Sequence, residues 1–128
     1  MADNTLFDKY GLIMDSGKII FKENEIGDKM YIIQEGNVRI SREIGGKEHI
    51  LAVLSKGDFF GEMALLFHQP RTASARAAEY CDLYYLDRST FDRVLRRYPE
   101  FKKKVVAFAK QRSSRPHDVV AEGNASDV

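Results

Sequence analysis

The chain has 128 residues, of which 44% are hydrophobic and 30% charged, and its formal net charge is +1. This length predicts one domain with a buried core, and the near-neutral charge excludes a partner selected by overall charge. Cys81 is the only cysteine, so an internal disulfide is excluded and a reducing compartment is expected. Because no apolar run is long enough to span a membrane and the start has no signal-peptide pattern, we expect a cytoplasmic protein without a membrane span.

After a short N-terminal segment, residues 1–11, the pattern over residues 12–87 is typical of short β-strands. Apolar runs of three to five residues alternate with turns that contain glycine, and residues 50–54 form one such run. Many short strands at fairly even spacing predict a mainly β fold of the jelly-roll type, a β-barrel also called a double-stranded β-helix.

The stretch from Phe59 to Ala77 has the chemistry of a pocket for a small phosphate ester. Gly61 lets a ligand approach the backbone, and residues 62–66 favour a short helix whose first amides can bind an anion. Arg71 follows a proline, so its guanidinium comes from a separate extended segment and can bind two phosphate oxygens. Glu62 would repel a phosphate unless its oxygens accept hydrogen bonds, for which a ribose hydroxyl is a suitable donor. A ligand with a phosphodiester and a ribose hydroxyl satisfies both residues.

Three motifs in this stretch, Gly61-Glu62, Ala64-Leu65 and Pro70-Arg71-Thr72-Ala73, resemble the phosphate-binding cassette of cyclic nucleotide-binding domains. Such domains occur in catabolite activator proteins, cyclic-nucleotide-dependent kinases and ion channels, and the resemblance covers about residues 12–112. It implies that Glu62 binds the ribose 2′-hydroxyl, that Arg71 binds the cyclic phosphate, and that nearby amides bind further oxygens. The residues that it implies as ligand-binding are Gly61, Glu62, Met63, Ala64, Arg71, Thr72 and Ala73.

The pattern becomes helical after Asp87. Ser89–Asp92 is predicted to cap a short helix, and Pro99 suits the first turn of a second helix. Four residues of this second helix fall on one face: Phe101, Val105, Phe108 and Arg112. In the family that the chain resembles, the C-terminal helix is a lid over the nucleotide, which implies that residues 88–112 form a hinge and a lid. The alternative is that this face only closes the bottom of the roll.

The resemblance also implies a pocket for the base. Leu51 or Val53 is expected to hold the base by apolar contact, which discriminates weakly between purines. From the lid, Val105 or Phe108 is expected to contact the base and Arg112 to stack on it. In the family, a threonine at the position of Thr72 is associated with cyclic GMP, although related modules with this residue also bind cyclic AMP. We expect cyclic AMP as the ligand, with cyclic GMP close behind.

Of three possible functions, a sensor that binds a cyclic nucleotide and signals through movement of its C-terminal helices, without catalysis, is favoured. A jelly-roll enzyme is disfavoured because His49, His68 and His117 lack metal-binding spacing and no nucleophile has a nearby base. A scaffold that binds no nucleotide and uses its basic helices for a protein partner is disfavoured too. In such a scaffold, buried Glu62 and Arg71 would each carry a desolvation cost. No metal or cofactor is expected beyond the nucleotide ligand.

The C-terminal end and the surface carry further signals. Residues 113–128 are expected to be disordered. The many basic residues of the helical region are interpreted as a solvated face, with an acidic partner, anionic lipid or nucleic acid as the alternative. No helix-turn-helix follows the lid, so direct DNA binding is not expected. We expect a stand-alone, prokaryotic-type module that acts on a protein partner in trans, with a fragment as the alternative. The sequence leaves the oligomeric state open.

Overall fold

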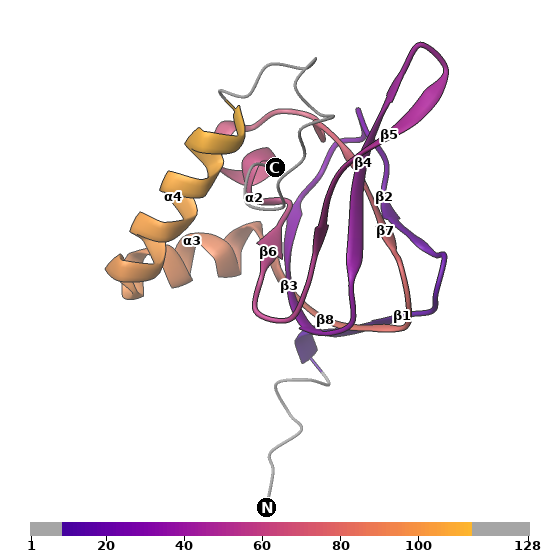
Figure 1. Ribbon diagram of the computed structural model, residues 1–128. Coiled ribbons are helices and arrows are strands. Elements are labelled where there is room, and N and C mark those ends of the chain that lie inside the picture. Colours follow the sequence, from indigo (N-terminus) through magenta and orange to yellow (C-terminus); the bar gives the residue numbers. More distant parts are fainter. Residues whose placement is uncertain (1–8, 114–128) are drawn as a thin grey trace, which may run out of the picture.

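The computed structural model describes residues 9–113, in which two antiparallel sheets form a roll and helices lie beside it (Figure 1). The strands are β1 (Gly11–Met14), β2 (Ile19–Phe21), β3 (Lys29–Glu35), β4 (Val38–Ile44), β5 (Lys47–Leu54), β6 (Phe59–Phe60), β7 (Ser74–Ala77) and β8 (Cys81–Asp87). The helices are α2 (Glu62–Phe67), α3 (Arg88–Arg97) and α4 (Pro99–Ser113). The predictions for residues 1–8 and 114–128 lie outside the described residues.

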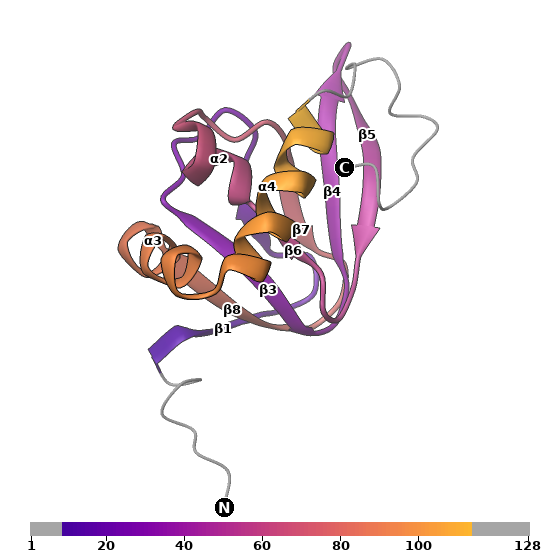
Figure 2. The same cartoon turned by 90° about the vertical axis from the view of Figure 1, so that its left-hand side faces the viewer.

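The two sheets have the strand orders β1-β8-β3-β6 and β2-β7-β4-β5. Strands from opposite ends of the roll segment are therefore neighbours, since β1 pairs with β8 and β2 pairs with β7. This wrapping is typical of a jelly roll, and it confirms the predicted fold class of a β-roll with C-terminal helices. The helices lie together on one side of the roll (Figure 2). Within residues 9–113, no helix has the length and apolar character needed to cross a membrane.

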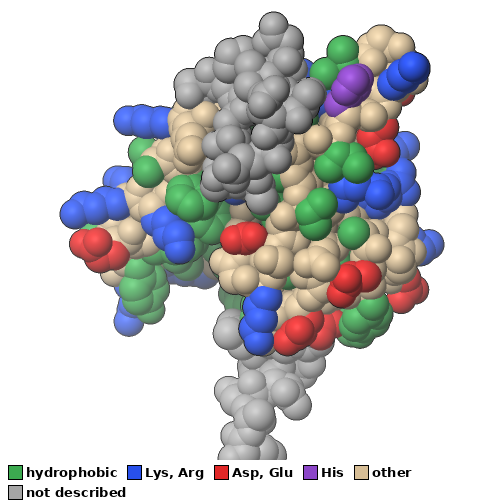
Figure 3. Space-filling model, in the orientation of Figure 1, with side chains coloured by type: hydrophobic (Ala, Val, Ile, Leu, Met, Phe, Trp, Pro, Cys, Tyr) green, Lys and Arg blue, Asp and Glu red, His purple; other side chains and the backbone are tan. Residues whose placement is uncertain are grey.

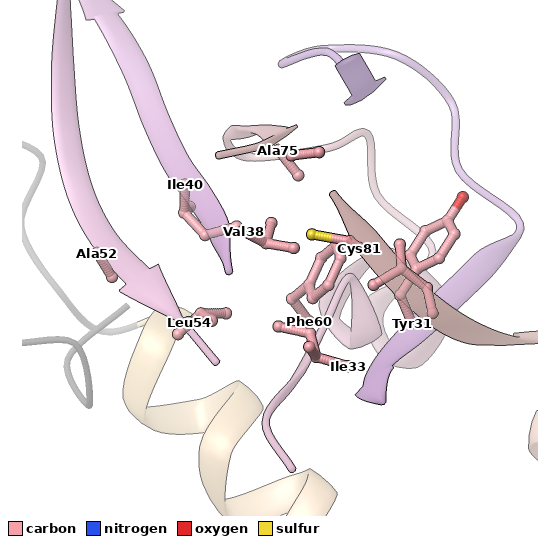
Figure 4. Close-up of a cluster of buried hydrophobic side chains, with 11 residues drawn as sticks. Tyr31, Ile33, Val38, Ile40, Ala52, Leu54, Phe60, Ala75 and Cys81 are labelled. Carbon is pink, nitrogen blue, oxygen red and sulfur yellow. The ribbon is translucent and has the colours of Figure 1, made fainter. Parts of the chain in front are cut away.

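One hydrophobic cluster fills the space between the two sheets (Figure 4). Val38, Ala75 and Leu83 are fully buried there, because alternate residues of each strand point inward. Cys81 is also fully buried, and its thiol lies 3.1 Å from the carbonyl oxygen of Asn37. Burial raises the pKa of this thiol. Cys81 therefore behaves as an inert core residue.

A second hydrophobic cluster joins the helices to the roll. It consists of Met30, Phe59, Leu65, Phe91, Leu95 and Val105. These residues come from β3, β6, α2, α3 and α4, so every described helix is attached to the sheet that contains β3 and β6. The cluster thus sets where α4 lies relative to the segment around Gly61.

The start of α3 differs from the sequence expectation. Asp87, the last residue of β8, is the N-cap, because its backbone is extended and its carboxylate accepts a hydrogen bond from the Thr90 amide at 2.9 Å. The helix therefore begins at Arg88, and the capping box predicted at Ser89–Asp92 is wrong. The earlier start of α3 is not visible in the sequence, because its N-cap, Asp87, is also the last residue of a strand.

Candidate functional site

Gly61 determines how the chain enters the short helix α2. Its φ is +87°, which L side chains rarely adopt, and a Cβ there would lie 2.9 Å from Nη1 of Arg71 and 3.3 Å from the Lys29 carbonyl oxygen. Both the backbone angle and the available space therefore require glycine. The turn brings Arg71 against the beginning of α2, although ten residues separate it from Gly61.

Arg71 is buried, with 5% of its surface exposed, and is held by the main chain. Its Nη1 donates to the Gly61 carbonyl at 2.9 Å, and its Nη2 donates to the Lys29 carbonyl at 2.7 Å. The guanidinium carbon lies 3.9 Å from the centre of the Phe21 ring, which makes a cation–π contact. Burial lowers the pKa of Arg71, but a guanidinium stays protonated in proteins. A fixed positive charge thus lies beside α2.

Two further features hold the Arg71 side chain in place. Phe21 belongs to a group of aromatic rings in which Tyr31 and Phe60 stack with their centroids 5.2 Å apart. On another side lies the backbone of Gly27, where an added Cβ would collide with Nε and Cζ of Arg71. From the sequence, Gly27 is recognisable only as one of the residues of the roll, and this contact was missed. A glycine 44 residues away gives no local sign that it packs on an arginine.

Glu62, the first residue of α2, is almost completely buried, with 1% of its surface exposed. Its Oε1 accepts a hydrogen bond from Nη1 of Arg112 at 2.8 Å. Its Oε2 is buried and has no hydrogen-bond partner among the described residues. Burial raises the pKa of Glu62, and the positive charge of Arg112 opposes that rise. The carboxylate therefore has one oxygen able to accept a further hydrogen bond.

Arg112 connects the end of α4 to this carboxylate. Its Nη2 donates to the Phe59 carbonyl at 3.2 Å, and its guanidinium carbon lies 5.3 Å from the centre of the Phe108 ring. Val105, also on α4, is fully buried, and the Phe108 ring lies 5.1 Å from the Phe59 ring. The three predicted lid residues thus lie together against β6 and α2.

The remaining cassette residues surround the same place. Met63 and Ala64 follow Glu62 in α2, and Thr72 and Ala73 follow Arg71. The exposed Thr72 hydroxyl donates weakly to the Met63 sulfur at 3.9 Å. The structure therefore brings together the residues predicted as ligand-binding, with Arg112 as an added neighbour of Glu62.

The predicted base contacts on β5 are separated by a β-bulge. Ile40 pairs with Ala52 while the next residue, Ser41, pairs with Ile50, which leaves Leu51 as an extra residue. Leu51 packs partly against the inner cluster, whereas Val53 is 47% exposed on the outer face. The structure therefore brings Leu51, but not Val53, to the inner side of the roll. Ala52 is buried on this side too, which was not predicted from the sequence. Strict alternation would have placed Leu51 and Val53 on one face, and the bulge is not visible in the sequence.

The histidines and acidic residues form no metal centre in the part of the chain that the structure describes. His68 ends α2 in a left-handed conformation and is exposed. It lies on the loop between α2 and β7, whereas His49 belongs to β5, in the sheet β2-β7-β4-β5.

A family model described as "Cyclic nucleotide-binding domain" matches residues 14–98, which include the whole segment around α2. The chain belongs to the cyclic nucleotide-binding domain family. Domains of this family are regulatory modules that bind a ligand. The sequence resemblance is thereby confirmed.

The proteins that the chain is similar to include a cyclic nucleotide-gated channel, a catabolite activator protein and a regulatory domain of PKA. The domain is 43% identical over 91 residues to the mouse potassium/sodium hyperpolarization-activated cyclic nucleotide-gated channel 2, covering 71% of this chain and 10% of the channel. The Thermus thermophilus catabolite activator protein superposes with a TM-score of 0.76 at 33% identity, covering 85% of this chain and 52% of that one. The regulatory domain of Toxoplasma gondii PKA, co-crystallised with cAMP, has a TM-score of 0.66 at 29% identity, covering 88% and 41%. The chain thus spans about a tenth of the channel's length.

Proposed function

We propose that this domain is a cyclic nucleotide sensor that binds cyclic AMP, with cyclic GMP as the second candidate, and performs no catalysis. The observation that carries the proposal is the buried Glu62 carboxylate, whose Oε2 lacks a donor among the described residues and lies in the same turn as Gly61. A buried acceptor without a donor costs about 1 to 3 kcal/mol, which a ribose hydroxyl would relieve. The similar regulatory domain from Toxoplasma gondii was crystallised with cAMP, which supports the same choice of ligand.

In this proposal, Arg71 binds the cyclic phosphate. Two of its five N–H groups hold the backbone of Gly61 and Lys29, so the charge is fixed before a ligand arrives. The amides of Met63, Ala64 and Thr72 bind further oxygens, and Ala73 lines the site. The base lies between Leu51 of the roll and Phe108 and Arg112 of α4. Val53 is left out because it faces outward, and Val105 because it is fully buried in the cluster that joins α4 to the roll.

In this proposal, α4 changes position when a nucleotide binds to the site. Arg112 already donates to Oε1 of Glu62. A ribose hydroxyl that donates to Oε2 therefore binds the same carboxylate that holds the end of α4. A ligand shifts a helix only through its different affinities for the two helix positions, and the shared carboxylate supplies such a difference. We propose that the moved helix acts on a protein partner in trans, without direct contact with DNA.

Calorimetric titration with cyclic AMP, cyclic GMP and 5′-AMP tests ligand binding. The protein is first denatured and then refolded, which removes any ligand carried over from the host. Saturable heat is expected with a cyclic nucleotide and none with 5′-AMP, because the open monophosphate has a different shape and charge. No heat from a correctly refolded protein would refute the nucleotide proposal and favour the scaffold alternative.

If the exposed Thr72 hydroxyl binds guanine, Thr72→Ala should weaken cyclic GMP binding about fivefold and leave cyclic AMP binding unchanged.

Helix movement has a separate test. The chain has no tryptophan, so Phe101→Trp introduces a single fluorescent probe on α4 that lies beside Phe59 and outside the proposed base contacts. Saturating cyclic nucleotide is expected to shift its emission, while the control variant Tyr80→Trp, at an exposed position on the roll, should not respond. Calorimetric binding by the Phe101→Trp variant with an unchanged emission spectrum would refute movement of α4 and leave binding intact.

A further inference from the structure

Positive charge is concentrated in one part of this nearly neutral chain. Residues 88–104 include seven lysines and arginines against two acidic residues, which gives this segment a net charge of +5. Because the whole chain has a formal net charge of +1, all other residues together carry −4. The segment consists of α3 and the first turns of α4, so these cations lie on two successive helices.

Six of these cations are exposed around the junction of α3 and α4, and we name this surface the basic corner. It consists of Arg93, Arg96, Arg97, Lys102, Lys103 and Lys104. Figure 3 shows blue side chains over this end of the molecule, away from the β4–β5 hairpin. Among the described residues, one cation of the corner forms an ion pair: Lys103 Nζ lies 3.5 Å from Glu100 Oε2. That pair is highly exposed and so binds weakly.

The composition of the basic corner fits some polyanions better than others. Lysine is depleted in protein–protein interfaces, which rely on buried apolar anchors. Between residues 88 and 104, Tyr98 is the one large hydrophobic side chain that is largely exposed. The same segment has no asparagine or glutamine to read adenine, and its single exposed aromatic ring is too few for a base-stacking platform.

An anionic lipid surface does not need a matched shape. Lysines and arginines are attracted to an anionic leaflet, and tyrosine favours the level of the headgroups. Tyr98 is the C-cap of α3, directly after Arg97, and its carbonyl accepts the Lys102 amide, so its backbone lies between the arginines and the lysines of the corner. We propose that the basic corner docks the domain on a membrane surface rich in anionic lipid, with Tyr98 at the headgroup level.

Vesicle co-sedimentation tests this proposal directly. The wild-type protein is expected to bind vesicles of phosphatidylcholine with about 30% phosphatidylserine, and not phosphatidylcholine alone, at roughly 0.1 M salt. The triple variant Lys102→Gln/Lys103→Gln/Lys104→Gln should bind about 100-fold more weakly, since each contact contributes about fivefold. Tyr98→Ser should weaken binding a few-fold.

The matched control is Lys18→Gln/Lys22→Gln/Lys47→Gln, which removes the same charge from exposed sites on the roll. It should bind the vesicles nearly as well as the wild type, and the thermal transitions of both variants should show that they fold. Equal losses in the two triple variants would overturn the proposal, as would equal binding to both vesicle types. Tighter binding to polyglutamate or to single-stranded DNA than to the vesicles would also overturn it.

Discussion

Arg71 is fixed by two carbonyl groups and an aromatic ring, and the described residues place no carboxylate within ion-pair distance of it. Carbonyl oxygens orient a guanidinium but do not neutralise it. The charge therefore remains available to an anion, whereas the charge of Arg112 is already paired with Glu62. Two arginines near one short helix thus have different roles.

Replacing Arg71 with alanine should weaken cyclic nucleotide binding by two to three orders of magnitude. This corresponds to about 2 to 5 kcal/mol for truncating one partner of a buried charge pair. Calorimetry measures the affinity, and the exposed arginine in α3, Arg97→Ala, is the control expected to bind normally. An unchanged affinity in the Arg71 variant would place the phosphate elsewhere.

Gly27→Ala should displace the Arg71 guanidinium without touching the ligand itself. An added Cβ would collide with Nε and Cζ of Arg71, and overpacking of this kind costs about 1 to 3 kcal/mol. We expect affinity for the cyclic nucleotide to fall about tenfold or more. Gly45→Ala is the comparison, because its Cβ would meet no atom within 4 Å although its φ is positive. It should lower the melting temperature but not the affinity, and equal affinities in the two variants would contradict the role of Gly27.

At the scale of elements, α4 is attached by its apolar face in the middle and by Arg112 near its end. Val105 and Ala109 are fully buried, and Arg112 holds both Glu62 and the Phe59 carbonyl. The helix therefore contacts the element that begins the binding segment, across 50 residues of sequence. Local patterns showed the apolar face of α4 but not the partner of Arg112.

Arg112→Ala should lower the free energy of unfolding by about 3 to 5 kcal/mol, because it leaves a buried carboxylate without its charge partner. The double variant Glu62→Gln/Arg112→Ala should recover part of this loss. Urea denaturation of the wild type, both single variants and the double variant measures the coupling. Lys110→Ala, exposed in the same helix, should change stability by no more than about 0.5 kcal/mol. Strict additivity of the two changes would mean that the ion pair contributes nothing.

At the scale of the whole molecule, the buried Glu62 links stability to pH. Burial raises its pKa above the usual value of 4.5, so the folded state binds a proton more tightly than the unfolded state. The stability that this proton supplies is present below pH 4.5 and is lost as pH rises through the folded pKa. The free energy of unfolding of the wild type should therefore fall, relative to Glu62→Gln, as pH rises from about 4.5 toward neutrality. Urea denaturation across this range measures it, and a relative rise would show that Arg112 outweighs burial.

The sequence predicted the parts of the site that are close together in the chain. Gly61, Glu62 and Arg71 lie within eleven residues, and their motif carries both the chemistry and the family resemblance. The contacts of Gly27 and Arg112 depend on how distant segments meet, and the bulge at Leu51 depends on strand register. Even a correct fold class does not fix such contacts, because a one-residue shift in register exchanges the two faces of a strand.

The contact of Arg112 lies one residue before the end of a helix that starts at Pro99. A helix of 15 residues is about 22 Å long, so in the proposed movement it would act as a lever whose fulcrum is the junction with α3. A rotation of roughly 10° at the fulcrum would move its tip by about 4 Å, more than the 2.8 Å that separates Arg112 from Glu62. A small angular change at the base of the helix is therefore enough to break or make the contact at its tip.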